Sequence, residues 1–250
     1  MRTIFIFLFC IISTYIGAQT KAPVVMLDRY TIDSSGKAGK IQFMLNNALE
    51  QTTYKLTKGG KWFRLTKDKE LVLKNSKQKK SSYEIEITAK ADRQKLKHKF
   101  VLLMDSFAHN KVIAHRGAWK NFNVPENSLA SLQASFELGC EGSEFDVHLS
   151  ADSVVFIHHD ANKGDVFIEK TNAADLRKVS LSNGEPLPLL TDYLERGMKQ
   201  HTTMLVLELK PSVISKERSL ALARKVMEDV RKAHAEAWMI YISFDYAILR

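Results

Sequence analysis

The sequence is poor in cysteine, with two among 250 residues. Cys10 lies in an apolar segment at the N-terminus, and Cys140 stands alone in the rest of the chain. One remaining thiol excludes an internal disulfide framework, so stability has to come from packing and from bound metal. We expect Cys140 to be a buried thiol that packs as a small apolar side chain.

The chain also lacks an apolar run long enough to span a membrane. Arg2 is followed by apolar residues from Ile4 to Ile12, whereas a spanning helix needs about 20. Gly17-Ala18 then provides the small residues that favour signal cleavage. We therefore expect residues 1–18 to be an export signal, with no transmembrane segment after its cleavage and a periplasmic or extracellular location.

Negative charge is scarce in one half of the chain. Residues 21–110 hold 19 Lys/Arg against 9 Asp/Glu, while residues 111–250 hold 17 against 19. A basic half can contact anionic lipid headgroups, polysaccharide or nucleic acid, or it can be a solvated lysine-rich surface. Because the lysines are scattered without regular aromatic interleaving, no nucleic-acid partner is expected. An anionic-surface contact and the solvated surface both stay open.

Residues 22–107 show the alternation of β-strands. Apolar and polar residues alternate in 40–45, 71–73 and 83–87, and turn signals such as Gly59-Gly60 separate these runs. Tyr83, Ile85 and Ile87 fall on one face of their strand. The pattern predicts a small all-β sandwich, loosely similar to cadherin-like or immunoglobulin-like repeats but without the acidic calcium motifs of cadherins.

From residue 110 onward, predicted strands alternate with predicted helices, which indicates a parallel sheet in a (β/α) barrel or a doubly wound fold. Asn127 is available as a cap for the first helix. The strands are expected at 112–114, 145–149, 154–157, 204–209 and 239–242, the first as a buried strand, and the helices at 128–138, around 190–194 and at 217–235.

Chemically active residue types cluster where these strands end. In a parallel barrel the carboxyl ends of all strands meet at one rim, where active sites lie. Two residues that are two positions apart on a strand also share one face. We therefore expect one pocket to contain His115 and Arg116 after the first strand, Glu144 and Asp146 on the second, His159 after the third, and Glu208 and Lys210 at the fourth.

Each of these residue types suits the cleavage of a phosphodiester. The guanidinium of Arg116 and the ammonium of Lys210 can bind a negative phosphate. The carboxylates of Glu144, Asp146 and Glu208 offer oxygen ligands to a divalent cation such as Ca²⁺ or Mg²⁺. Histidine titrates near neutral pH, so one imidazole can accept a proton while another donates one.

The same residues lie in motifs that resemble the glycerophosphodiester phosphodiesterase family over residues 112–248. The motifs occur in the family's order: His115-Arg-Gly, Pro125-Glu-Asn-Ser128, Glu144-Phe-Asp146, Leu149-Ser-Ala-Asp152, His158-His-Asp160, Gly184-Glu-Pro-Leu-Pro188, Leu207-Glu-Leu-Lys210 and Ser243-Phe-Asp245. The resemblance implies a TIM barrel that hydrolyses glycerophosphodiesters to sn-glycerol 3-phosphate and an alcohol, with a divalent metal.

The resemblance also implies individual roles. His115 and His159 match the acid–base histidines of the family, and Arg116 matches its phosphate-binding arginine. Glu144, Asp146 and Glu208 match its metal ligands, and Lys210 matches a substrate-binding lysine. Glu126 is expected to support the site by orienting Arg116, with a favourable helix start as the alternative.

The remaining histidines are not expected to take part in catalysis. His148 shares a face with Glu144 and is expected at the exposed end of its strand, although it could approach the metal. His158 points the opposite way and is expected to be structural. Surface positions are predicted for four others: His98, His109, His201 and His234.

A complete barrel has eight strands, and residues 110–250 provide about five on this count. We therefore expect either a fragment of a longer gene product or a truncated, inactive chain. Two other functions stay open beside the small-molecule phosphodiesterase. One is a phosphodiesterase that acts on whole phospholipids, and the other is a noncatalytic protein that binds an anionic surface and keeps a vestigial barrel.

Overall fold

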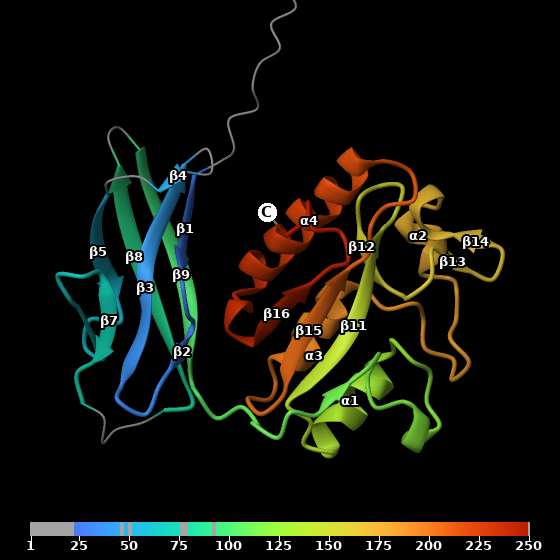
Figure 1. Ribbon diagram of the computed structural model, residues 1–250, viewed down its shortest axis with the longest axis horizontal. Helices are drawn as coiled ribbons and strands as arrows, with labels where there is room; N and C mark the ends of the chain where they lie inside the picture. Colours follow the sequence, from blue (N-terminus) through green and yellow to red (C-terminus); the bar gives the residue numbers. More distant parts are fainter. Residues whose placement is uncertain (1–22, 46–47, 50–51, 76–79, 92–93, 250) are drawn as a thin grey trace, which may run out of the picture.

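The computed structural model describes residues 23–45, 48–49, 52–75, 80–91 and 94–249, and these residues fold into two units (Figure 1). The predicted export signal at residues 1–18 lies outside the described residues. Within the part of the chain that the structure describes, no helix is long and apolar enough to cross a membrane.

The first unit consists of two β-sheets. One sheet has the strand order β1-β3-β7-β6, with β4 beside β3, and the other has the order β2-β9-β8-β5. All pairings are antiparallel except that of β2 with β9. The strands are β1 (Val24–Leu27), β2 (Thr31–Ile32), β3 (Lys37–Leu45), β4 (Ala48–Leu49), β5 (Thr53–Lys58), β6 (Phe63–Leu65), β7 (Glu70–Leu73), β8 (Ser82–Ala91) and β9 (Gln94–Met104).

Side chains from both sheets share one apolar core. Phe43 and Leu71 from the first sheet and Ile85 and Phe100 from the second are all at most 1% exposed. The predicted alternation of β8 is confirmed, because Tyr83, Ile85 and Ile87 are buried and Glu84 between them is exposed. The opposite face of this sheet is therefore free to carry charge.

The second unit contains a sheet with the order β10-β11-β15-β16, in which every neighbouring pair is parallel. Along the chain, the helices alternate with these strands (Figure 1). The elements are β10 (Ile113–Ala114), η1 (Lys120–Phe122), α1 (Leu129–Glu137), β11 (Gly142–Leu149), β12 (Val155–Ile157), β13 (Asn162–Lys163), β14 (Val166–Phe167), η2 (Ile168–Lys170), α2 (Ala173–Leu176), α3 (Leu190–Gly197), β15 (Met204–Leu209), α4 (Lys216–Ala233), η3 (Glu236–Trp238) and β16 (Met239–Ile242).

Two expectations about these strands are wrong. The third strand, β12, is not a parallel barrel strand: it runs antiparallel to β11, with Val147 opposite Ile157. The short turn at 150–154 folds the chain straight back, and a parallel return would need a longer crossover. The first strand, β10, is not buried, since Val112 and Ile113 are 51% and 46% exposed. The sheet thus holds four parallel strands and one antiparallel arm.

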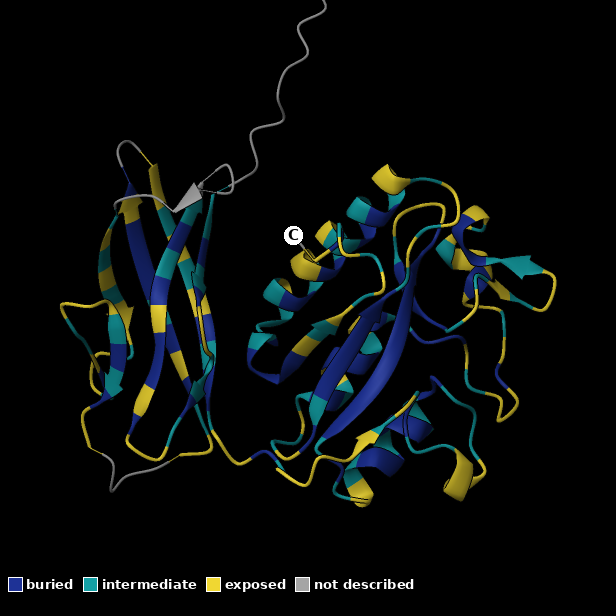
Figure 2. Cartoon of the chain, viewed as in Figure 1, coloured by how far each residue is buried: buried dark blue, intermediate teal, exposed yellow. Residues whose placement is uncertain are grey.

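The alternation along β11 divides the sheet into two faces. Phe145, Val147 and Leu149 pack in a core with side chains of α1, α3 and α4. Glu144, Asp146 and His148 therefore point to the other face of the sheet. Figure 2 shows β11 buried along its whole length, so these polar side chains are buried as well.

The two units are in contact beside η3. Leu103 and Phe107, at the end of β9 and after it, belong to the core cluster of the second unit. His98 on β9 lies 3.4 Å from Glu236 Oε1, and its ring packs edge-on against His234. The predicted surface position of His98 is therefore wrong, because its carboxylate partner comes from a segment 138 residues away.

Candidate active site

Three buried carboxylates meet on the open face of the parallel sheet. Asp146 on β11 and Glu208 on β15 are direct partners in the parallel ladder, and Glu144 is one pleat earlier on β11. Their exposed fractions are 4% for Glu144, 0% for Asp146 and 6% for Glu208. One oxygen from each lies within 4.8 Å of the others. The sheet register therefore assembles the trio.

Lys210 supplies one positive charge to this trio. Its Nζ lies 2.7 Å from Glu208 Oε1 and 2.9 Å from Asp146 Oδ1. Burial acts to lower the pKa of Lys210, but the hydrogen bonds to Glu208 and Asp146 outweigh it and the pKa is raised. Lys210 is therefore a fixed cation, and one ammonium faces three carboxylates.

Glu144 is the least compensated member of the trio. Burial, and then the charge of Asp146, raise the pKa of Glu144 from 4.5 to about 7. Among the described residues its Oε1 has no hydrogen-bond partner although the atom is buried. A buried carboxylate oxygen without a donor is costly unless a cation satisfies it.

The loop after β10 adds the predicted His-Arg-Gly motif in a strained conformation. Arg116 has a φ of 57° and Gly117 a φ of 78°, both in the left-handed region. A Cβ at position 117 would collide with Ser131, so glycine is required there. The turn directs the Arg116 N–H to Glu144 Oε2, at 2.8 Å, and it brings His115 Nε2 to 4.0 Å from the same oxygen.

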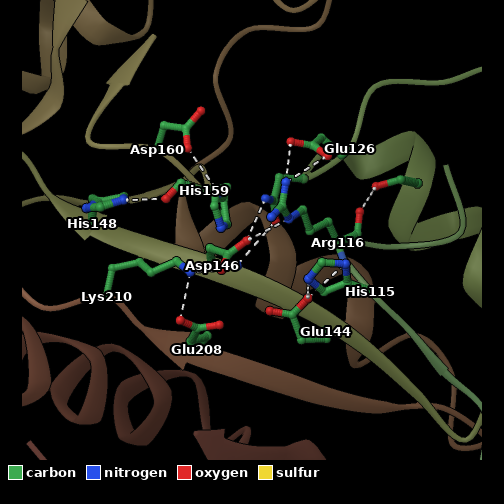
Figure 3. Close-up of polar contacts among 12 residues, drawn as sticks. His115, Arg116, Glu126, Glu144, Asp146, His148, His159, Asp160, Glu208 and Lys210 are labelled. Carbon is green, nitrogen blue, oxygen red and sulfur yellow. Dashed lines mark hydrogen bonds and ion pairs between the residues drawn. The ribbon is translucent and has the colours of Figure 1, made fainter. Parts of the chain in front are cut away.

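The guanidinium of Arg116 is held from two sides (Figure 3). Its Nη1 donates to both oxygens of Glu126, at 3.1 and 3.2 Å, and its Nε lies 3.9 Å from Asp146 Oδ2. Glu126 therefore contacts Arg116 directly, in the way the sequence predicts.

Asn127 is a site residue that the sequence reasoning missed. It was expected to cap the first helix, but Ser128 is the N-cap of α1, and Asn127 instead exchanges two hydrogen bonds with Asp146. Its φ of 52° turns the side chain away from the helix. The available signal was its place next to Glu126, the partner of Arg116, in the same motif.

His159 reaches the site from the antiparallel hairpin and not from the end of a barrel strand. Its Nδ1 lies 2.8 Å from Asp160 Oδ1, and its backbone carbonyl accepts a hydrogen bond from His148 Nε2 at 3.0 Å. In the view of Figure 3, His159 and His115 lie on the two sides of the Arg116 guanidinium.

His148 differs from its prediction. It is 4% exposed, and its burial lowers its pKa, so it is a neutral donor under the His159 carbonyl and not a residue at an exposed strand end. His158 is also buried, with its Nε2 3.2 Å from the carbonyl of Asn162. Both histidines therefore hold the hairpin that carries His159.

The pocket next to His115 is open. A cavity of about 260 Å³ is lined by His115 and by residues 117–121. His115 is 71% exposed at its side chain, whereas the three carboxylate residues are at most 6% exposed. The lining does not include the three carboxylates, and His115 connects this cavity to Glu144, whose Oε2 lies 4.0 Å from its Nε2.

The structure brings all the predicted site residues together around the trio, through direct contacts or through a shared loop. They are His115, Arg116, Glu126, Glu144, Asp146, His159, Glu208 and Lys210 (Figure 3). Three converging carboxylate oxygens are the donor set of a hard divalent cation. The trio could therefore bind a metal ion, and the unpaired oxygen of Glu144 fits that interpretation.

Comparisons with known proteins identify similar sequences. The sequence model described as the glycerophosphoryl diester phosphodiesterase family matches residues 115–250. A glycerophosphodiester phosphodiesterase of Caldanaerobacter subterraneus is 28% identical over 152 residues, which are 56% of this chain and 60% of that protein. The uncharacterized protein YqiK of Bacillus subtilis is 30% identical over 150 residues, which are 54% of this chain and 58% of that protein.

A solved structure is similar over the same part of the chain. The crystal structure of a glycerophosphodiester phosphodiesterase from Parabacteroides distasonis shares 40% identity with a TM-score of 0.53, covering 55% of this chain and 58% of that one. The likeness implies a TIM-barrel-like α/β fold for the second unit. The chain spans 58% and 60% of the length of the two curated relatives.

Proposed function

The chain belongs to the glycerophosphoryl diester phosphodiesterase family, and we propose that the protein hydrolyses glycerophosphodiesters to sn-glycerol 3-phosphate and an alcohol. The observation that carries the proposal is the site itself. Two histidines, an arginine and a lysine surround a buried trio of carboxylates. The chain spans about three fifths of the length of its curated relatives. The activity of the whole protein is therefore put forward as a proposal.

Glu144, Asp146 and Glu208 would hold a divalent cation, Ca²⁺ or Mg²⁺. When bound, such a cation would supply positive charge that stabilises the negative charge developing on the phosphoryl oxygens. The support for a cation is the charge balance of the trio: besides Lys210, the nearby guanidinium is that of Arg116, which also pairs with Glu126, and the pKa of Glu144 is raised. Oxygen-only ligands favour hard cations over zinc.

Arg116 and Lys210 are the proposed phosphate-binding groups. The guanidinium of Arg116 is oriented by Glu126 and is 21% exposed, so its free edge can donate to phosphate oxygens. Lys210 is 14% exposed and lies between Asp146 and Glu208. Both cations are pre-positioned by carboxylates, so little reorganisation is needed when an anionic substrate binds.

His115 and His159 are the proposed acid–base pair. One imidazole accepts a proton from the attacking water as its oxygen bonds to phosphorus. The other donates a proton to the alcohol oxygen as its bond to phosphorus breaks. Asp160 accepts from His159 Nδ1–H, which leaves Nε2 for this proton transfer. General acid–base help of this kind accelerates reactions by about 10²–10⁴-fold per group.

The test is hydrolysis of glycerophosphocholine by the wild type and by His115→Ala and His159→Ala, with and without EDTA. Each substitution is expected to lower kcat by at least about 10²-fold. EDTA is expected to abolish hydrolysis, and added Ca²⁺ or Mg²⁺ to restore it. His109→Ala is the matched control, because His109 is 71% exposed and remote from the trio. Undiminished hydrolysis in EDTA would overturn the metal assignment.

A phospholipid substrate panel separates the two enzymatic alternatives. Hydrolysis of phosphatidylcholine at a rate equal to that of glycerophosphocholine would favour an enzyme for whole phospholipids. We further propose that the protein is exported, on the basis of the apolar run and small residues in 1–18. A contact between the basic first unit and an anionic surface is a separate proposal, supported by its 19 Lys/Arg against 9 Asp/Glu.

A further inference from the structure

One half of the outer face of the sheet β2-β9-β8-β5 is lined by lysine. The outer face consists of the side chains that point away from the core. Its half near the carboxyl end of β8 contains Lys55 on β5, Lys90 on β8, and Lys95 and Lys97 on β9. All four are exposed. We call these four residues the lysine face.

The strand register places these lysines in adjacent rows. One row runs Thr53–Lys90–Lys95 across three strands, and the next runs Lys55–Thr88–Lys97. Thr88 is only 6% exposed although it points outward, which is consistent with coverage by the long side chains on either side of it. The lysines thus form a continuous cationic surface in which like charges oppose each other directly.

Among the described residues of this outer face, the carboxylates are Glu84 and Glu86, in the rows beyond Lys97. Glu84 pairs with Lys58 at 2.9 Å, and Glu86 pairs with Lys97 at 3.0 Å. Among the described residues, Lys55, Lys90 and Lys95 have no carboxylate within ion-pair distance. Directly opposed like charges such as Lys90 and Lys95 destabilise a sheet, and an anion bound over them would relieve their repulsion.

We propose that the lysine face docks the protein on a lipid bilayer that contains anionic phospholipids. The inference deepens the proposed anionic contact of the first unit and does not depend on the phosphodiesterase proposal. A sheet surface with four exposed lysines presents an extended array of positive charge, and each lysine near an anionic leaflet strengthens binding by about fivefold.

The composition of the face favours a bilayer over a nucleic acid. Single strands are bound by aromatic platforms on which bases stack, and the outward rows named above contain only lysine and threonine. Lysine is a hydrated point charge without the planar fork that arginine uses for directional contacts. A diffuse field of headgroup charges needs no such directionality.

The orientation of the two units is compatible with docking. In Figure 1 the carboxyl end of β8, which carries Lys90, and the carboxyl end of β11, next to the carboxylate trio, lie on the same side of the molecule. The second unit contacts the first beside η3, which precedes β16 and so lies toward the opposite ends of the parallel strands. Although Leu103 of β9 packs into the core of the second unit, all four residues of the lysine face stay exposed.

The test is cosedimentation of the full chain with vesicles of phosphatidylcholine alone or with about 30% phosphatidylglycerol, at about 50 mM and about 500 mM salt. The wild type is expected to bind the anionic vesicles more strongly than the neutral ones and to lose that excess at high salt. Lys90→Gln with Lys95→Gln is expected to lower the excess binding by about 25-fold.

The matched control is Lys40→Gln with Lys67→Gln. It removes the same charge from two exposed positions outside the lysine face, Lys40 on β3 of the other sheet and Lys67 in the turn that joins β6 and β7 of that sheet. Its expected effect is less than about threefold. All variants keep residues 1–22, so binding of the apolar run to lipid is the same in each of them. The neutral vesicles measure this charge-independent binding.

Three outcomes would overturn the proposal: equal losses in the two double variants, equal binding to the two kinds of vesicle, or release from anionic vesicles by a stoichiometric amount of single-stranded oligonucleotide. The last would identify nucleic acid as the preferred partner. Hydrolysis of soluble glycerophosphocholine is expected to be unchanged in both variants, so a docking failure and a failure of the phosphodiesterase proposal are distinguishable.

Discussion

Asn127 and Asp146 hold each other by two hydrogen bonds that run in opposite directions. The side-chain amide of Asn127 donates to Asp146 Oδ2 at 2.9 Å, and the backbone N–H of Asp146 donates to Asn127 Oδ1 at 3.2 Å. The pair fixes the orientation of the central carboxylate of the trio. It also explains why Asn127 adopts a left-handed backbone, a conformation that asparagine tolerates better than most residues.

Asn127→Gly and Asn127→Ala are expected to lower the affinity for Ca²⁺ or Mg²⁺ by about 10–100-fold, because both remove the partner that orients Asp146. Asn127→Ala is expected to lose a further ~1 kcal/mol of stability, since alanine is strained at a φ of 52°. Titration calorimetry and urea denaturation measure the two effects. Unchanged affinity in both variants would show that Asp146 is oriented without Asn127.

Glu144 is expected to make the metal-free protein less stable as the pH rises. Folding raises its pKa from 4.5 to about 7, so the folded state keeps a proton that the unfolded state has lost. The contribution of Glu144 therefore favours folding below pH 4.5 and is lost as the pH rises toward 7. Relative to Glu144→Gln, the wild type should lose stability across this interval.

Urea denaturation in EDTA at several pH values measures that difference. Glu137→Gln serves as the control, because it removes one carboxyl group from an exposed position and leaves the buried carboxyl groups unchanged. A difference between wild type and Glu144→Gln that does not change with pH would contradict the expectation.

Glu169 ties η2, in which it lies, to the loop after β15. Its buried carboxylate accepts from the Val213 N–H at 3.1 Å and from the Ser212 hydroxyl, and it lies 3.9 Å from Arg218 Nε. Glu169→Ala is expected to destabilise the protein by about 3 kcal/mol, because it leaves buried donors and a partly buried guanidinium without an acceptor. Denaturant unfolding tests this.

The control for Glu169 is Glu228→Ala, which removes a carboxylate that is 67% exposed at its side chain. A change within about 0.5 kcal/mol is expected there. Equal effects of the two substitutions would show that the Glu169 contacts contribute little.

Phe107 couples the two units, because it is 7% exposed within the core cluster of the second unit. Phe107→Ala is expected to destabilise the protein by about 3 kcal/mol and to split a single thermal transition into two. Scanning calorimetry measures both. Phe244→Ala, at a phenylalanine that is 89% exposed, should change neither. A single transition at a lower temperature would mean that other contacts keep the units coupled.

Much of the site could be predicted because strand periodicity has a direct geometric meaning. Glu144 and Asp146 are two residues apart in a strand, so they share a face in any sheet. The apolar residues between and after them, Phe145 and Val147, show which face is covered by helices. The sequence places Glu208 and Asp146 in one pocket by assuming a parallel sheet, and the two do lie together. Their direct pairing was not predicted, because it follows from β12 folding back and leaving β15 next to β11.

Other features could not be predicted from the sequence, because they depend on the direction of the backbone or on residues far away in the chain. Alternation is the same in parallel and antiparallel strands, so it did not reveal that β12 folds back on β11. The side-chain contacts of Asn127 depend on a left-handed φ, which the sequence alone does not show. The burial of His98 depends on Glu236, in another unit of the chain.

Because Asp146 and Glu208 are on different strands, the site forms only when β11 and β15 pair in the correct register. A slip of one residue between β11 and β15 would exchange the faces of every side chain on the slipped strand and put a leucine where a carboxylate belongs. A cation that needs both oxygens can bind only the correctly aligned pair. By mass action it would therefore favour the native alignment over misaligned forms. Cation binding would then stabilise the correct strand register of the sheet that carries the site.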